Sequence, residues 1–275
     1  LLVVLVLAEA GWYGAVQEWL LLALCTAVGI AAGWWRSRDT VRTDWSRHWH
    51  GVLIFILGAV VIMLLPRRGE WIAGGWDPGL YVDEGLAVAR TGTFHPAPEP
   101  FLRHLSPAEF HLFTRGDETY RESFTGVPVD PFTGQTRLYF FRLTPCWTAM
   151  LARCGGMRAA TRVNIFTGWL VVLVFPALLL ALRCRAAQVA LGTLLLWINP
   201  LWLYHAHTPV SEMLQVLLIC GLGLLLAGGK WSLGRAVLVG LFFMAGVLNR
   251  FAFLPFAGMV GVLLGGWSAE REVSL

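Results

Sequence analysis

The sequence predicts an all-α polytopic membrane protein: a transmembrane helix bundle with one large extracytoplasmic loop of mixed short helices and strands. Composition is the first reason, because 57% of the 275 residues are hydrophobic and 14% are charged, against about 45–50% apolar and 25% charged residues in soluble domains. The second reason is that the apolar residues gather in windows separated by connectors. The third is that Lys and Arg fall in alternate short connectors, as expected of a membrane topology.

Eight apolar windows are expected to form the helices of the bundle. Several of them are shorter than the ~20 residues that cross a bilayer, so flanking aromatic and small residues would have to extend them. The last two windows could instead form one pair that is broken around Asn249 and Arg250. The windows are residues 1–8, 15–35, 52–65, 164–182, 189–204, 213–227, 236–248 and 251–267.

The basic connectors orient the bundle. Arg or Lys stands in residues 36–50, 183–185 and 230–235, whereas the intervening connector 205–211 has neither. Short cytoplasmic loops carry an excess of Lys and Arg. The basic connectors are therefore predicted to be cytoplasmic, and the long polar segment 66–162 to be extracytoplasmic.

The predicted organisation has three parts. Residues 1–50 hold N-terminal spans and a cytoplasmic connector, residues 51–267 form a core that includes the loop 66–162, and residues 268–275 start a continuation. Because the chain opens on Leu1 inside an apolar run, we expect it to be a piece of a longer protein. The formal net charge is +4, but the arginines are scattered and form no basic stripe, so no nucleic-acid partner is expected.

Local patterns predict short elements inside the extracytoplasmic segment. Two runs with strand-like composition flank Arg115-Gly116-Asp117, which we interpret as the turn of a hairpin. The expected elements are a helix at 79–90, strands at 111–114, 119–124 and 136–141, and a helix at 145–151 that lies on the membrane surface.

Three carboxylates stand close together in residues 76–84, after the third apolar window. An ionised Asp at the centre of a membrane helix costs roughly 2.5–3.5 kcal/mol, so acids gathered at the membrane boundary indicate a candidate site. On a helix, Tyr81 and Glu84 would share one face. Two plainer interpretations stay open: Asp77 caps the helix that follows, and Asp83 and Glu84 lie on its solvated face.

The order of several motifs resembles that of a known enzyme superfamily. The motifs are Asp77 and Tyr81 followed by Arg90-Thr91-Gly92, then Phe141-Arg142-Leu143-Thr144-Pro145 with Gly155-Gly156, then Asn199-Pro200 with Thr208-Pro209 and Glu212-Met213, and last Asn249-Arg250-Phe251. With these motifs, residues 51–266 resemble the glycosyltransferase type C superfamily (GT-C). Its members are integral-membrane enzymes that use polyprenyl-phosphate sugars, among them the lipid A aminoarabinose transferase and the protein O-mannosyltransferases.

By this resemblance, Asp77 matches the loop Asp that acts as general base or orients the acceptor. A carboxylate within hydrogen-bond reach of the acceptor hydroxyl takes its proton as the hydroxyl attacks the anomeric carbon and phosphate leaves. Pro78 departs from the Asp-Glu pair common in the family, so Glu84 or Asp83 is expected to supply a second acid. The implied enzyme moves a sugar to a lipid, glycan or protein acceptor at the outer face of a bacterial inner (plasma) membrane.

The leaving phosphate needs positive charge, and the planar guanidinium of Arg binds two phosphate oxygens. Arg250 and Arg142 are the candidate phosphate-binding residues, although Arg250 could instead anchor the chain at the lipid interface. Tyr81, Glu212 and His207 are the candidates for sugar or acceptor binding. The plainer interpretation of Glu212 is that the helix dipole favours a carboxylate in a first turn.

No cofactor is required for such a transfer, and no metal site is predicted. His205 and His207 alternate on a loop with Glu212 near, which is a weak metal signature; a divalent metal is compatible with this pattern but not indicated by it. The alternative function is a membrane transporter or a non-catalytic lipid-binding membrane component. Transporters place charges near the bilayer midplane, whereas Glu18, Glu212 and Arg250 stand near the ends of apolar windows.

Overall fold

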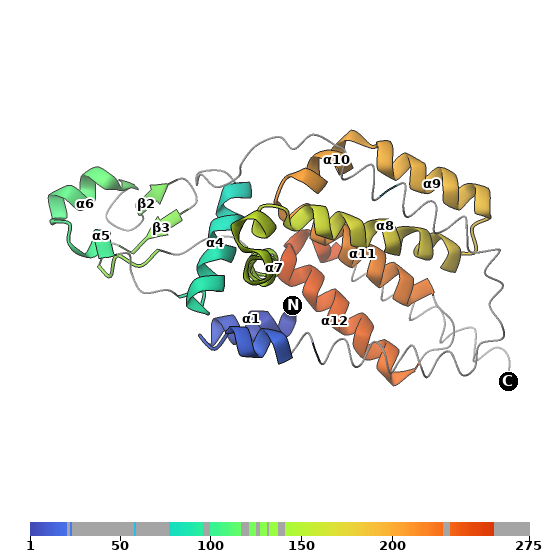
Figure 1. Cartoon of the computed structure of the whole chain (residues 1–275), viewed down its shortest axis with the longest axis horizontal. Coiled ribbons are helices and arrows are strands. Elements are labelled where there is room, and N and C mark those ends of the chain that lie inside the picture. The colour runs from blue at the N-terminus through green and yellow to red at the C-terminus, as the bar shows by residue number, and fades with distance from the viewer. Residues whose placement is uncertain are drawn as a thin grey trace. The chain divides into compact units, whose positions relative to one another are not determined.

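The protein is mostly helical in its computed structural model, as predicted, and its few strands lie in the long polar segment (Figure 1). The predicted domain boundaries at residues 50 and 267 lie outside the described part of the chain. The structure describes residues 1–20, 23, 58, 77–95, 100–116, 121–124, 127–130, 132–136, 141–227 and 232–255.

The chain divides into two compact units, which are treated one at a time below. Unit 1 comprises Leu1–Leu57, Glu70–Phe140 and Pro145–Thr161. Unit 2 comprises Gly58–Gly69, Phe141–Thr144 and Arg162–Leu275.

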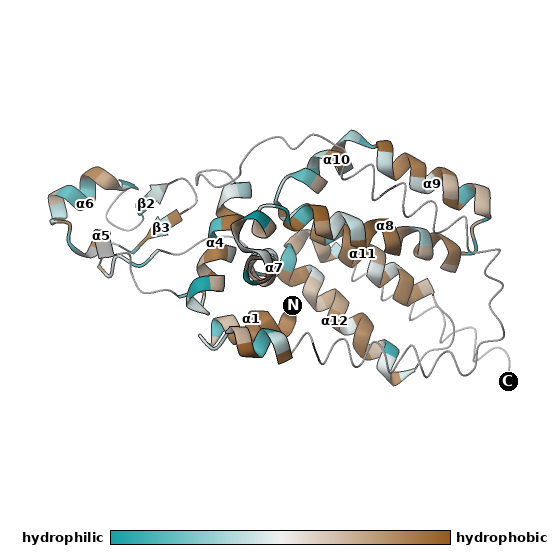
Figure 2. Cartoon of the chain, viewed as in Figure 1, coloured by the Kyte–Doolittle hydropathy of each residue, from teal (hydrophilic) through white to brown (hydrophobic). Residues whose placement is uncertain are grey.

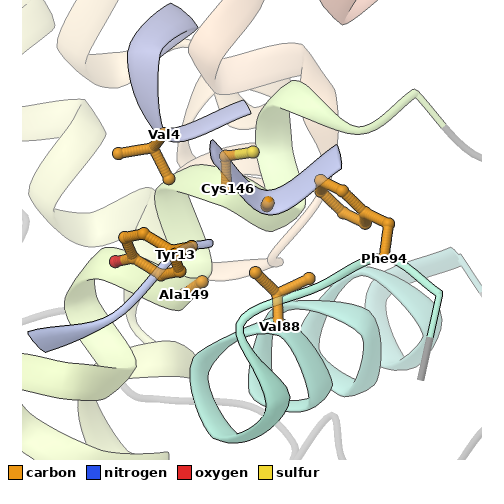
Figure 3. Close-up of a cluster of buried hydrophobic side chains, with 7 residues drawn as sticks. Val4, Tyr13, Val88, Phe94, Cys146 and Ala149 are labelled. Carbon is orange, nitrogen blue, oxygen red and sulfur yellow. The ribbon is translucent and has the colours of Figure 1, made fainter. Parts of the chain in front are cut away.

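Unit 1 is built on three helices from distant parts of the sequence: α1 (Leu2–Glu9), α4 (Asp77–Thr91) and α7 (Leu143–Ala160), whose first two residues belong to unit 2. Their apolar side chains point toward one another in a buried cluster (Figure 3). The backbone of α7 is kinked, because Gly155 and Gly156 have non-helical torsion angles. The cluster contains Val4, Ala8, Tyr13, Val88, Phe94, Cys146 and Ala149.

Helix α4 confirms the predicted helix at 79–90 and begins at Asp77. It is buried on almost every side, from Pro78 to Val88. It approaches α7 closely at Gly85, where a Cβ atom would lie 2.6 Å from the Cβ of Thr148. The absence of a side chain at this position therefore lets the two helices pack tightly.

The rest of the long polar segment corrects part of the sequence prediction. A hairpin exists, since β1 (Arg115–Gly116) pairs antiparallel with β2 (Arg121–Phe124), and β3 (Val127–Val129) completes the sheet in the order β1-β2-β3. The interpretation of Arg115-Gly116-Asp117 as its turn is wrong, because Arg115 and Gly116 form the strand β1. The predicted strand at 111–114 is wrong, because its first three residues belong to α6 (Pro107–Phe113). Sequence reasoning overlooked the start signal of this helix, a capping box in which Ser106 and Glu109 satisfy each other's backbone amides.

The predicted strand at 136–141 is found only as a single bridge. Thr136 pairs with Val129, residues 137–140 lie outside the described part, and Phe141 is not in a strand. A short helix, α5 (Pro100–Arg103), precedes α6. The predicted helix at 145–151 is confirmed as part of the longer α7.

Unit 2 is a helical bundle in which α11 packs against both α8 and α12, and α9 packs against α8. Figure 2 shows hydrophobic residues along most of these helices. The apolar windows at 164–182, 213–227 and 236–248 are confirmed as helices. The helices are α8 (Val163–Ala181), α9 (Ala186–Ile198), α10 (Pro200–His207), α11 (Ser211–Ala227) and α12 (Leu233–Asn249), followed by the 3-10 turn η1 (Phe251–Phe253).

The window at 189–204 is not one helix, which corrects the prediction. It divides into α9 and α10, whose axes differ by 60°. The reason is local: Pro200 lacks the backbone N–H that an unbroken helix needs, and the side chain of Asn199 caps α10 by accepting from Leu201 N at 2.9 Å and Trp202 N at 3.3 Å. His205 and His207 consequently lie in a helix and not on a loop.

Within the described residues, α8 is the one continuous helix long and apolar enough to cross a membrane, with 19 residues and a mean hydropathy of 2.3. The bent pair α9 and α10 meets the same test when taken together, and α11 and α12 are apolar but shorter. Most of the windows at 15–35 and 52–65 lies outside the described residues. The polytopic bundle therefore stays a prediction.

Candidate functional site

One end of the unit 2 bundle collects the polar side chains of otherwise apolar helices. The chain runs away from this end along α8 and α11 and returns to it along α10 and α12. The residues at this end, which we call the bundle end, lie at or next to the starts of α7, α8 and α11 and the ends of α10 and α12. They are Arg142, Thr144, Asn164, His207, Thr208, Ser211, Glu212, Gln215, Asn249 and Arg250.

Asn164 fixes the turn between α10 and α11. Its side-chain amide Nδ2, which has two hydrogens to donate, lies within hydrogen-bond distance of three backbone carbonyls, those of His205 at 3.1 Å, Thr208 at 2.6 Å and Val210 at 2.7 Å. Asn164 is buried, at 2% exposure, so these bonds are shielded from water and hold α8 to the turn that precedes Ser211.

Asn249 joins three segments at the bundle end. Its Oδ1 accepts a hydrogen bond from Thr144 Oγ1 at 2.8 Å, and its Nδ2 donates to Ser211 O at 3.0 Å and to Gln215 Oε1 at 2.9 Å. Asn249 and Thr144 are both fully buried. The last residue of α12 is thus tied to the start of α7 and to the first turns of α11.

Two predicted site residues, Arg250 and Glu212, form an ion pair with each other. Arg250 directly follows Asn249, and its Nη1 donates to Glu212 Oε1. Both side chains are partly open to solvent, at 38% and 37% exposure. The structure therefore brings a candidate phosphate ligand and a candidate sugar ligand to one place.

The second predicted phosphate ligand, Arg142, lies on a segment that runs beside that of Arg250. The ring of Phe141 packs edge-on against Phe251 with centroids 4.8 Å apart, and Thr144 bonds Asn249. The residues that flank Arg142 therefore contact the residues that flank Arg250. Two arginines that are distant in the sequence are thereby placed at the bundle end on neighbouring segments.

The histidine pair does not form the geometry of a metal site. His205 and His207 both lie in the last turn of α10, and residues two apart on a helix point in nearly opposite directions. Among the described residues, no group of three His, Cys, Asp or Glu side chains is placed to hold a metal ion. His207 stays a candidate for substrate binding because of its position at the bundle end.

The candidate acids lie in unit 1, on α4. Asp77 is the first residue of this helix and is exposed, where the helix dipole favours a carboxylate. The interpretation of Asp83 and Glu84 as a solvated face is wrong for Glu84, which is buried together with Tyr81 because neighbouring elements cover α4 on most sides. Burial also raises the pKa of Asp83 to about 6, although Arg90 opposes this shift.

Asp77 and the bundle end belong to different units. The predicted convergence of Asp77 with Glu212 and Arg250 stays a prediction, as do the base and capping roles of Asp77. Within unit 2, Glu212 and Arg250 form an ion pair at one end of the bundle, and Arg142 lies on a segment beside that of Arg250.

Sequence reasoning missed a buried polar cluster in unit 1. Glu18, at 3% exposure, accepts from Tyr13 OH at 2.8 Å and from Cys154 Sγ at 3.6 Å. Arg153 lies 3.7 Å from the Glu18 carboxylate and 4.6 Å above the Tyr13 ring, and burial raises the pKa of the Tyr13 phenol. A Glu inside an apolar window is the signal that could have revealed this link to α7.

The chain has no match among known proteins: no family model, no curated protein and no solved structure is similar to it. The resemblance to the GT-C superfamily consequently depends on the motifs and their order alone. The bundle end is what the structure adds to those motifs.

Proposed function

We propose that this chain is the membrane part of a glycosyltransferase that moves a sugar from a polyprenyl-phosphate donor to an acceptor on the extracytoplasmic face. The observation that carries the proposal is the bundle end, where Arg142 and Arg250 stand on neighbouring segments fixed by buried hydrogen bonds. Both arginines were candidate phosphate ligands on sequence grounds. Asp77 is the proposed base, and the acceptor is a lipid, a glycan or a protein.

The surface of the bundle supports a location in a membrane. Large apolar side chains such as Leu180 (60% exposed) and Leu191 (57% exposed) face outward, whereas polar Asn164 and Thr193 are buried. This distribution is the reverse of a soluble bundle. Lipid tails would cover the outer leucines, and the inner polar groups would keep their hydrogen bonds.

Close contacts at glycine also fit helix packing in lipid. A Cβ at Gly221 would lie 2.4 Å from the ring of Phe242, and one at Gly246 would lie 2.5 Å from the ring of Phe253. Small residues that let neighbouring segments approach closely are typical of membrane helix interfaces. The contact at Gly246 also packs η1 against α12, one turn before Arg250.

The charge of the bundle end suits a phosphate diester. Arg142 and Arg250 bring guanidinium groups to the bundle end, and a guanidinium can bind the singly charged phosphate of a sugar-phosphate-lipid linkage. Because their segments are fixed before the ligand arrives, little reorganisation opposes the stabilisation of the negative charge that grows on the leaving phosphate.

In the proposed reaction, the acceptor hydroxyl oxygen attacks the anomeric carbon of the donor. The bond between that carbon and the phosphate oxygen breaks, and the electron pair leaves with polyprenyl phosphate. Asp77 takes the hydroxyl proton, and Arg250 with Arg142 binds the departing phosphate. Direct attack inverts the configuration at the anomeric carbon.

The alternative of a non-catalytic lipid-binding component uses the same arginines without the chemistry. The ion pair between Glu212 and Arg250 fits this alternative as well, since an arginine that exchanges a carboxylate for a lipid phosphate need not take part in sugar transfer. A transporter is less well supported, because the charged pair lies at one end of the bundle and not midway along its helices.

The test measures binding and transfer separately in the full chain reconstituted in nanodiscs. Polyprenyl monophosphate is the binding probe, and polyprenyl-phosphate hexoses and pentoses are the donors for transfer to added lipid and glycan acceptors. Arg250→Gln should weaken binding about tenfold or more, since hydrogen bonds to charged groups contribute about 1.5–3 kcal/mol. The matched control is Arg185→Gln at the opposite end of unit 2, which should bind as the unmodified chain does.

The Asp77→Asn variant tests the proposed role of Asp77 as base independently of phosphate binding. It should abolish transfer while binding of polyprenyl monophosphate stays within about twofold, because a base acts on the acceptor and not on the phosphate. Asp130→Asn is the control, because Asp130 lies in the turn after β3, where its carboxylate accepts hydrogen bonds from the backbone of Phe132 and Thr133. Binding without transfer in the unmodified chain would support the lipid-binding component, and no binding would reject both functions.

A further inference from the structure

We infer that Glu212 determines which phosphate lipid the bundle end retains, by exchanging its carboxylate for the ligand's phosphate on Arg250. This inference rests on the proposed function and concerns the same site. On binding, the donor phosphate takes the place of Glu212 on the guanidinium, and the released carboxylate accepts hydrogen bonds from hydroxyl groups of the donor sugar. Polyprenyl monophosphate, the product, offers no such hydroxyl groups.

The backbone around Arg250 is fixed on both sides, so exchange involves side chains only. Asn249 before it makes three buried hydrogen bonds. Phe251 after it packs on Phe141, and the fully buried Phe253 packs on Phe243 with ring centroids 5.7 Å apart. Arg250 itself has an extended backbone, with φ −162° and ψ 138°, between α12 and η1.

The ion pair is of a kind that a better anion displaces easily. Both side chains are more than one-third exposed, and exposed ion pairs contribute little to stability because water solvates the separated charges well. A phosphate presents more acceptor oxygens than a carboxylate and can bind the guanidinium through two parallel hydrogen bonds. Breaking the ion pair so that phosphate can replace Glu212 on Arg250 therefore costs little free energy.

Glu212 cannot move far once it is released. It is in the first turn of α11, and the carbonyl of Ser211 beside it accepts a hydrogen bond from Asn249 at 3.0 Å. An ionised carboxylate only accepts hydrogen bonds. Sugar hydroxyl groups supply the donors it needs, whereas a bare phosphate adds a like charge next to it.

This difference separates donor from product. The donor is a diester with one negative charge, and the product monoester approaches two negative charges above its second pKa of about 6. Without Glu212, the arginines would bind the more highly charged product more tightly. Glu212 opposes that preference, so we expect it to promote product release.

The experiment compares polyprenyl monophosphate with a polyprenyl-phosphate hexose for binding to the full chain in nanodiscs at pH about 8, where the monoester is doubly charged. Glu212→Gln should bind the monophosphate about fivefold or more tightly, since removal of one close like charge has an effect of at least this size. The ratio of hexose donor to monophosphate affinity should fall by a similar factor. If Glu212 had a purely structural role, Glu212→Gln would lower the affinity for both ligands by the same factor and leave the ratio of the two affinities unchanged.

Two further variants complete the design. Glu109→Gln is the charge-matched control, because Glu109 acts in the capping box of α6 and Gln serves in that motif equally well. In an Arg250→Gln background, the added Glu212→Gln change should raise the affinity for the monophosphate by a smaller factor than it does in the unmodified chain, because no ion pair is left to release. Glu212→Ala should reproduce the direction seen with Glu212→Gln.

The outcomes distinguish this inference from the proposed function. If Arg250→Gln weakens binding and Glu212→Gln leaves monophosphate affinity unchanged or lower, the phosphate site stands and the exchange is wrong. If the unmodified chain binds neither ligand, both the phosphate site and the exchange are rejected.

Discussion

Thr144→Val tests whether Asn249 organises the bundle end. The change keeps the shape of a β-branched side chain but removes the hydroxyl that donates to Asn249 Oδ1 at 2.8 Å. Both residues are fully buried, so water does not replace the lost partner. Hydrogen bonds between membrane helices contribute about 0.6 kcal/mol on average and up to about 1.7 kcal/mol. We expect Thr144→Val to lower the free energy of unfolding by nearly the upper value, because Asn249 Oδ1 would lose this partner where water cannot reach it.

Asn249→Leu removes all three hydrogen bonds of this side chain at once, and about 2 kcal/mol is expected at the average value per bond. In the double variant with Thr144→Val the losses should not add, because both changes remove the same bond. Thr193→Val is the matched control. Thr193 is also buried, but its hydroxyl donates to Val189 O in its own helix, at 2.7 Å, and not to another segment of the described part of the chain.

The assay is reversible unfolding of the purified chain in mixed micelles, with the free energy of unfolding compared across the four variants and the unmodified chain. Thr144→Val should lower the free energy of unfolding clearly more than Thr193→Val does. Equal costs, or full additivity in the double variant, would refute the assignment of Asn249 as the residue that ties α7, α11 and α12 together.

Two further predictions concern unit 1. Gly85→Ala should destabilise it by about 1–3 kcal/mol through overpacking, because the new Cβ would lie 2.6 Å from Thr148 Cβ. The control is Gly240→Ala in unit 2, where a Cβ would meet no atom of the described residues within 4 Å; it should be neutral or stabilising in the same unfolding assay. The pKa of Asp83 is about 6 against a reference of 3.8, so the folded state holds this proton more tightly than the unfolded state and stability should fall as pH rises from 3.8 to about 6. Asp83→Asn should abolish that fall, and equal pH profiles of melting temperature for Asp83→Asn and the unmodified chain would contradict it.

The helices of unit 2 could be predicted because apolar residues continue for many turns there. The windows that became α8, α11 and α12 are long, and their composition alone indicates burial or lipid. The break between α9 and α10 was missed although its signal was present, since Asn199 and Pro200 are a cap and a first-turn residue in sequence. The apolar residues on both sides of this pair concealed it.

The pairing at the bundle end could not be read from the sequence. Thr144 and Asn249 are 105 residues apart, and a single Asn in an apolar run does not indicate its partner. Arg250 and Glu212 were each identified as candidates from local features, but a local pattern cannot show that two opposite charges neutralise each other. Glu84 was misjudged for the related reason that helical spacing does not show what covers a helix.

In a membrane, apolar packing discriminates weakly between alternative rotations of a helix, because lipid and a neighbouring helix solvate a leucine side chain about equally well. A buried amide is different, since an unmade hydrogen bond in hydrocarbon is costly. Asn164 in α8 and Asn249 in α12 each bond the segment around Ser211, so together they select one rotation and one depth for both helices. That constraint holds the backbone of Arg250 in place while its side chain stays partly exposed, which is the combination that the proposed phosphate exchange requires.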